Sequence, residues 1–238
     1  MVVVAVIAIL ATMLFAGLAK GRDGARRIHC ISRHKQISMG LHLFANDAHG
    51  YPFKALSVLT NPMPGLSPFD TNNAAELWKL FQIAAKDINS PAILVCPGDR
   101  SRFVAKTFTA NGTADSFSHP NNRLNALSYF LSLEADERES QPQLILMGDR
   151  YLTIDLKTDS EKATLFLFGE QDIGSSSSIV PSVRWISTVH NGGGNVAMAD
   201  GSAQQLNTAK LREALRRQPY GGSRIWLPNS DATGRGNP

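Results

Sequence analysis

Apolar residues fill the first 19 positions of the chain, and charged residues begin only at Lys20. The run from Met1 to Ala19 holds no charge and no proline, and about 20 apolar residues are enough to cross the hydrocarbon core of a membrane. A cleaved secretory signal is the alternative, but no basic segment precedes the run and its helical spacing continues past Ala19. The pattern therefore predicts a retained membrane anchor made by nine side chains: Val2, Val3, Val4, Val6, Ile7, Ile9, Leu10, Leu14 and Phe15.

Beyond the apolar run, hydrophobic residues recur at helical spacing as far as about residue 48. Gly50 and Pro52 then predict the end of the helix, which would be about 70 Å long at 1.5 Å per residue. An amphipathic helix must pack its apolar stripe on another element, most simply a sheet. The residues expected to pack there are Ile31, Ile37, Leu41 and Phe44.

The rest of the chain alternates helical and strand patterns, and it predicts an α+β fold in which the long N-terminal helix packs on an antiparallel sheet. Asp200-Gly201 suits a type I′ hairpin turn, which needs positive φ at both central residues. The expected elements are helices 74–87 and 208–217, the second opened by Asn207 or Thr208, strands 92–95, 127–133, 143–147, 163–168 and 183–187, and a hairpin over 195–206.

These patterns divide the chain into three parts. Residues 1–25 would be the transmembrane half of the helix, and residues 26–218 a globular domain that includes the amphipathic half. Residues 219–238 are rich in Gly, Asn and Pro and are expected to form a flexible tail.

Charge is concentrated next to the apolar run. The net charge is +4, and six basic residues with one acid between Lys20 and Lys35 contribute +5, which leaves about −1 for the rest. Basic residues beside an apolar helix bind lipid headgroups, so inner-membrane lipid is an expected partner. Nucleic acid is not, because no platform of basic and aromatic residues follows. The positive-inside rule would place this cluster in the cytoplasm.

The two cysteines leave two alternatives open. Cys30 lies on the packing stripe and Cys96 follows a predicted strand, so the two could meet where helix and sheet pack. A disulfide is plausible outside the cytoplasm and would be worth about 4 kcal/mol in the chain-entropy model. Two separately buried thiols are the other interpretation.

One histidine and one aspartate carry the remaining candidate chemistry. His190 precedes Asp200-Gly201 by nine intervening residues, with three glycines between them, and such a set could form an acid–base or metal site. The favoured interpretation is a glycine loop that leads into a hairpin, with Asp200 in the turn and His190 bonded to a backbone group. Because no zinc-type spacing of His or Cys occurs, we expect no catalytic residue, no metal and no cofactor. The acids Asp99, Asp149, Asp155 and Asp200 are interpreted as scattered surface residues rather than as calcium ligands.

Several segments together resemble a known family. They are Val2–Leu14, residues 25–32, 35–37 and 41–47, then Cys96-Pro97-Gly98-Asp99, Gly148-Asp149-Arg150, and His190 with Asp200-Gly201. The chain resembles bacterial type IV pilin-like proteins, and more narrowly the pseudopilin-like proteins of the prepilin-type His-x9-Asp-Gly subfamily.

The resemblance implies a pilin fold anchored in the inner membrane by a single pass, with the globular part in the periplasm and available for a short helical filament. It also implies that other pilin-like subunits, bound through the N-terminal helix, and a secretion or assembly machinery are the partners. Members carry a prepilin peptidase site, a glycine followed by Phe-Thr-Leu-Ile-Glu, and we expect an in-frame version upstream of Met1.

Three functions are compatible with these features. The first is a structural, non-catalytic subunit of a type II secretion or type IV pilus-like envelope apparatus. The alternative is a membrane-tethered periplasmic binding module, which would present loops 109–122 and 170–194 to a glycan, a surface polymer or calcium. A hydrolase that uses His190 and Asp200 is the third and the least supported.

Overall fold

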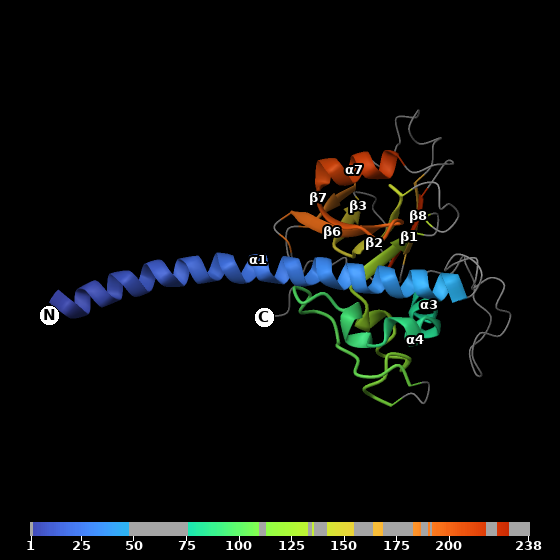
Figure 1. The fold of residues 1–238 in the computed structure, drawn as a ribbon, viewed down its shortest axis with the longest axis horizontal. Helices are drawn as coiled ribbons and strands as arrows, with labels where there is room; N and C mark the ends of the chain where they lie inside the picture. The colour runs from blue at the N-terminus through green and yellow to red at the C-terminus, as the bar shows by residue number, and fades with distance from the viewer. Residues whose placement is uncertain are drawn as a thin grey trace.

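A long helix and a six-stranded antiparallel sheet make up most of the structure, which is a computed structural model (Figure 1). It describes residues 2–47, 76–109, 113–132, 135, 142–154, 164–168, 183–186, 190, 192–217 and 223–228. The chain therefore has the predicted α+β class, with the helix at its N-terminus.

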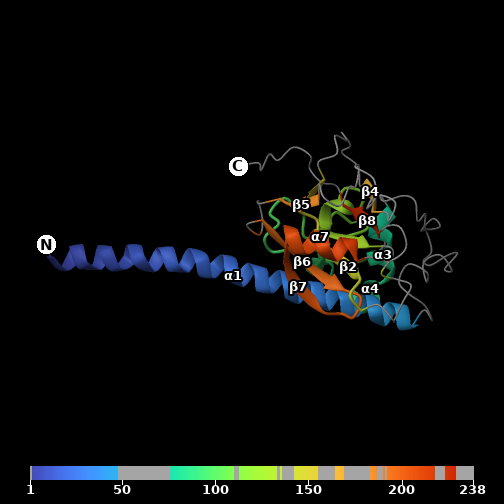
Figure 2. The ribbon, with the colours of Figure 1, turned by 90° about the horizontal axis from the view of Figure 1, so that it is seen from above.

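Helix α1 runs without interruption from Val2 to Asp47. Its front half projects away from the rest of the molecule, and its rear half lies along the domain (Figures 1 and 2). The change occurs near Cys30, the first fully buried residue among the helix side chains that the structure describes. Of the predicted packing residues, Ile37 and Leu41 are fully buried, Phe44 is almost so, and Ile31 is half-buried.

The large sheet has the strand order β4-β8-β1-β2-β6-β7, and every neighbouring pair in it is antiparallel. A second sheet pairs β3 with β5, also antiparallel. The strands are β1 (Tyr129–Ser132), β2 (Ile145–Asp149), β3 (Leu152–Ile154), β4 (Thr164–Phe168), β5 (Val183–Trp185), β6 (Gly193–Met198), β7 (Ala203–Asn207) and β8 (Ser223–Leu227).

Helices cover both faces of the large sheet. The rear half of α1 packs against β6, β7 and β2 on one face, and α3 (Leu77–Ile83) and α4 (Ala85–Ile88) lie beyond it (Figure 1). The opposite face is covered by α7 (Thr208–Arg216). Two hydrophobic cores result, one on each side of the sheet.

Side chains of β1 alternate between these cores, as the pleat of a strand requires. Tyr129 and Leu131 point into the core shared with α1 and α3, whereas Phe130 points into the core under α7. The segment predicted as helix 74–87 contributes four fully buried residues to the first core: Leu77, Leu80, Phe81 and Ala84.

The predicted hairpin is present, but its turn is of a different type. Strands β6 and β7 pair from Gly193↔Asn207 to Ala197↔Ala203. Gly201 has φ 80°, whereas Asp200 does not have positive φ, so the turn is not type I′. The hydrogen bonds Gly201 N–H to Met198 O and Met198 N–H to Ser202 O instead describe a type I turn with a bulge at Gly201.

Two further predictions from local pattern are wrong. Residues 92–95 were expected to form a strand, yet Pro91–Leu94 form the 3-10 helix η2, where Pro91, which has no N–H to donate, occupies a first-turn position. The expected flexible tail contains strand β8, which pairs with both β1 and β4, and its residues Ile225 and Leu227 are buried. Packing in the sheet outweighs the Gly- and Pro-rich composition around this strand.

The prediction of a membrane span also has to be corrected. Among the described residues, no helix is long and apolar enough to cross a bilayer, which needs about 20 apolar residues in succession. The prediction of a transmembrane half over residues 1–25 rested on the same apolar run. The predicted location, a single-pass inner-membrane protein with a periplasmic domain, is wrong on this finding. The nine predicted anchor side chains are exposed, from 49% for Val6 to 78% for Val2.

Candidate functional site

The carboxylate of Asp149 is the meeting point of three elements. Asp149 ends strand β2 opposite Tyr129 of β1, and it is 1% exposed. One of its oxygens, Oδ1, accepts a hydrogen bond from Nε2 of His34 on α1 at 3.0 Å. The other, Oδ2, accepts from the backbone N–H and the side-chain Nδ2 of Asn195 on β6, at 2.7 and 3.0 Å. A single buried charge thus links the helix to two strands.

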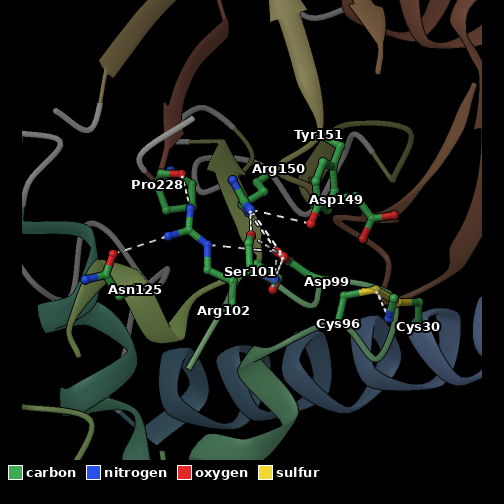
Figure 3. Close-up of polar contacts among 12 residues, drawn as sticks. Cys30, Cys96, Asp99, Ser101, Arg102, Asn125, Asp149, Arg150, Tyr151 and Pro228 are labelled. Atoms are coloured by element: carbon green, nitrogen blue, oxygen red, sulfur yellow. Dashed lines mark hydrogen bonds and ion pairs between the residues drawn. A yellow bond between two sulfur atoms is a disulfide. The ribbon is translucent and has the colours of Figure 1, made fainter. Parts of the chain in front are cut away.

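A disulfide lies beside this carboxylate. Cys30 of α1 is bonded to Cys96, which follows η2, so of the two alternatives for the cysteines the structure has the disulfide (Figure 3). Nε2 of His190 lies 3.5 Å from Cys96 Sγ and 3.4 Å from Asp149 Oδ2. These four residues are each 3% exposed or less. We call Cys30, Cys96, Asp149 and His190 the buried cluster.

A second buried network joins the two motifs that flank the cluster. Asp99 closes the Cys-Pro-Gly-Asp segment, and Arg150 follows Asp149. The guanidinium of Arg150 donates from Nε to Asp99 Oδ2 at 2.7 Å and from Nη2 to Asp99 Oδ1 at 3.2 Å (Figure 3). Both oxygens of Asp99 are thereby paired with one planar cation, the strongest arrangement for such a pair.

Hydroxyl groups and a second arginine complete this network. Asp99 also accepts hydrogen bonds from the hydroxyls of Ser101 at 2.8 Å and Ser128 at 2.9 Å. Arg102 lies 3.9 Å from the same carboxylate and donates from Nη2 to the carbonyl oxygen of Pro228 at 3.2 Å (Figure 3). The network therefore ties the segment after β8 to the loop after η2.

Burial and neighbouring charges shift the pKa values of these groups. Burial alone would raise the pKa of Asp99, but the hydrogen bonds and positive charge of Arg150 lower it to about 2. Burial, with the charge of Asp149, raises the pKa of Tyr129. Burial lowers the pKa of His190, although the charge of Asp149 opposes this shift. The imidazole of His190 is therefore held neutral more readily than a free one.

Several fully buried polar atoms near Asp149 have no hydrogen-bond partner within the described residues. Two of them belong to rings in contact with each other, because the rings of His34 and Tyr129 lie 4.6 Å apart. A buried polar atom without a partner costs roughly 1–3 kcal/mol. Several such atoms around one carboxylate therefore mark it as a candidate functional site. They are His34 Nδ1, Tyr129 Oη and Asn195 Oδ1, on residues that bond to Asp149 or lie opposite it in the sheet.

The two ends of the His190–Asp200 segment have separate roles. Asp200 is exposed, and its Oδ1 accepts the N–H of Ser202 at 2.8 Å, so it shapes the turn as the favoured interpretation expected. His190 instead contacts Asp149 and Cys96 rather than the backbone group that was expected. Gly201 supplies the left-handed conformation that the turn requires.

Gly194 in this segment and Gly148 in β2 are explained by packing. A Cβ on Gly194 would lie 2.5 Å from ring atoms of Trp185, which covers this point of β6 from β5. In the same way, a Cβ on Gly148 would lie 2.5 Å from the ring of Phe130. Both glycines are therefore needed so that an aromatic ring can approach the sheet.

The interpretation of the acids as surface residues is wrong for two of them. Asp99 and Asp149 are 4% and 1% exposed, and each has a charged or polar partner far away in the sequence. Asp155 lies outside the described residues, and only Asp200 is exposed as expected. The sequence did carry one signal of this, since Gly148-Asp149-Arg150 directly follows an apolar strand. Local spacing could not indicate that Asp149 bonds to His34 and Asn195, or that Asp99 bonds to Arg150.

The buried cluster limits the chemistry that can take place there. Its four potential ligand atoms all lie within 4.8 Å of one another, which the sequence spacing did not suggest. His190 and Asp149 are 3% and 1% exposed, so the cluster lies inside the described part of the domain rather than on its surface. The ligand types and their spacing are those of a site that could hold a metal ion.

Comparison with known proteins adds no assignment. No family model, no curated protein and no solved structure matches this chain. Its function is therefore argued from its own residues and geometry.

Proposed function

We propose that this chain is a structural subunit of a pilin-like filament in a type II secretion or type IV pilus-like envelope apparatus. In this proposal it assembles with other pilin-like subunits through the front half of α1. One observation carries the proposal, namely that this half of the helix projects from the domain with its apolar side chains exposed (Figure 1).

The exposed side chains cover all sides of the helix rather than one stripe. Successive residues of a helix are about 100° apart, so Val2, Val3 and Val4 alone face three different directions. They are 78%, 70% and 68% exposed, and the pattern continues to Phe15 at 71%. A helix that is apolar all round is stable in water only when it is surrounded, as at the centre of a helix bundle. Exposed apolar surface of this extent marks an interaction site.

Other features support the same proposal. The Cys30–Cys96 disulfide ties the rear half of α1 to the domain, and disulfides persist in the oxidising compartments where an envelope apparatus is built. The sequence motifs resemble those of pilin-like proteins, for which a helix-centred filament is the expected assembly.

The test compares two sets of substitutions in the same helix. The first variant carries Val6→Gln, Leu10→Gln and Leu14→Gln in the projecting half, where these residues are 49–66% exposed. The matched control carries Ile28→Gln, Met39→Gln and Leu43→Gln, which are 50–69% exposed but flank the domain. Glutamine keeps good helix propensity, so only the apolar surface changes. Each full-length protein is analysed by sedimentation velocity over a range of concentrations and by electron microscopy.

We expect the unmodified chain and the control variant to form discrete, concentration-dependent oligomers or filaments, and the first variant to remain monomeric. If the unmodified chain stays monomeric at all concentrations, or if both variants assemble equally well, the proposal is wrong. The reading frame upstream of Met1 offers a separate check, since a pilin-like subunit should have an in-frame prepilin peptidase site there.

A further inference from the structure

We infer that the reduced form of this chain binds a zinc-class divalent cation at the buried cluster, and that formation of the Cys30–Cys96 disulfide expels it. The inference is independent of the proposed assembly function. It rests on the four residues Cys30, Cys96, Asp149 and His190, which offer two sulfurs, one carboxylate oxygen and one imidazole nitrogen within 4.8 Å of one another. This is a complete four-ligand set of the types that zinc prefers.

The spacing of these atoms fits a tetrahedral ion. With bonds of about 2.0 Å to nitrogen and oxygen and about 2.3 Å to sulfur, tetrahedral corners lie about 3.4 Å apart for N and O and about 3.5 Å for S and N. In the structure, Nε2 of His190 is 3.4 Å from Asp149 Oδ2 and 3.5 Å from Cys96 Sγ. Both distances from His190 are thus those that zinc requires even with the disulfide closed, and the remaining ligand atoms lie within 4.8 Å of one another. Reduction would free the Cys30 sulfur to supply the fourth ligand.

The surroundings hold the ligands in position. Asp149 is oriented by His34 through Oδ1 and by Asn195 through Oδ2, as the carboxylate ligands of metals usually are. The unpartnered polar atoms of His34, Tyr129 and Asn195 lie on residues around the same carboxylate, and all three residues are fully buried. The carboxylate of the site is therefore buried and already held in place by hydrogen bonds.

Both steps of the exchange balance. In the first, two thiols bind the cation as thiolates and release two protons to solvent. In the second, a small-molecule disulfide accepts two electrons and two protons, which yields two small thiols, while the protein sulfurs join and the cation leaves. The cation would thus hold the two cysteines together in the reduced chain before oxidation.

The test uses the full-length chain, refolded anaerobically from urea with a phosphine reductant that is then removed. Zinc is titrated against a chromophoric chelator, and cobalt(II) is used as a spectroscopic substitute whose absorption reports thiolate ligands in tetrahedral geometry. We expect one zinc per reduced chain and none per oxidised chain. Added oxidised glutathione should release one zinc for each disulfide formed.

Variants distinguish zinc bound at the buried cluster from zinc bound by the two reduced cysteines alone. His190→Gln should weaken zinc binding by at least the roughly 100-fold that loss of an outer-shell partner can cost. Asp149→Asn should weaken it too, whereas His42→Gln, at an exposed position of α1, should not. Equal affinity of the His190→Gln variant and the unmodified chain would show that the folded site is not used, and would overturn the inference.

Folding of the reduced chain is followed by circular dichroism in the same titration. If the reduced chain is unfolded and zinc restores its spectrum, the inference is supported, because metal binding and folding are then coupled. If the reduced chain fails to bind zinc, whether folded or not, the inference is wrong. A Cys30→Ser/Cys96→Ser variant, which lacks both sulfurs, should bind no zinc, and zinc binding by it would also contradict the site.

Discussion

Asp99 and Arg150 form a two-point ion pair inside the protein although 51 residues separate them in sequence. The carboxylate is 4% exposed and the arginine 5% exposed. The pair joins the segment after the disulfide to the residue that follows Asp149. It therefore connects the two motifs that surround the buried cluster.

Replacing Arg150 should destabilise the protein strongly. An Arg150→Met variant leaves the charge of Asp99 buried without its main partner, and removal of one member of a buried pair costs about 3–5 kcal/mol. Urea denaturation would measure the loss. Arg217→Met is the matched control, because Arg217 pairs with Glu213 on the surface and should change stability by no more than about 0.5 kcal/mol. Similar losses in both variants would contradict a special role for the buried pair.

Stability should fall in acid through Asp99. Its carboxyl has a pKa of about 2 in the folded protein, against 3.8 for an unperturbed aspartate, which represents the unfolded chain. The folded state therefore binds the proton less readily than the unfolded state. The stabilisation is thus fully present above about pH 4 and is lost as the pH falls toward 2, by about 2 kcal/mol in total.

This acid dependence can be assigned by substitution. Asp99→Asn has no proton to bind, so its free energy of unfolding should fall less steeply between pH 4 and pH 2 than that of the unmodified chain. Urea denaturation at a series of pH values would measure both curves. Parallel curves would show that Asp99 does not contribute.

Loss of the disulfide should be costly because the loop it closes is long. Cys30 and Cys96 are 66 residues apart, and the chain-entropy model gives about 4 kcal/mol for a loop of this size. A Cys30→Ser/Cys96→Ser variant should therefore unfold at a lower urea concentration by a corresponding amount. Metal-free buffer with a chelator keeps this measurement separate from cation binding. An unchanged midpoint of urea denaturation would show that the disulfide does not stabilise the protein.

The glycine at position 194 should not tolerate even one methyl group. A Cβ there would lie 2.5 Å from the ring of Trp185, and overpacking of this kind costs about 1–3 kcal/mol. Gly193→Ala is the matched control in the same strand, where the nearest atoms to an added Cβ are 3.4 Å away. Thermal unfolding should show a clear loss for Gly194→Ala and a smaller one for Gly193→Ala. The reverse order would contradict the packing argument.

Elements governed by near neighbours could be predicted from the sequence. The stripe of α1 placed Ile37 and Leu41 in the core, and Asn207 caps α7 by accepting the N–H of Lys210, as its position before the helix indicated. The hairpin around Asp200-Gly201 was also expected, although its turn type was not. These features depend on contacts between residues a few positions apart, and periodicity and capping report such contacts directly.

Errors arose where tertiary contacts outweighed local composition. Strand β8 lies in a segment rich in glycine and proline, yet Ile225 and Leu227 are buried and the strand pairs with both β4 and β1. The apolar run before Lys20 predicted a membrane span that the described helices do not provide. For β8, composition described the segment but did not determine what it pairs with.

The sequence by itself determined the long helix, its apolar front half, most of the strands and the closing helix, because each depends on side chains close together along the chain. Only the tertiary structure decided that Asp149 would meet His34 across 115 residues and that His190 would meet Cys96 across 94. Such contacts depend on strand register and on how α1 lies across the sheet. These are cooperative properties of the whole fold, and no local spacing encodes them.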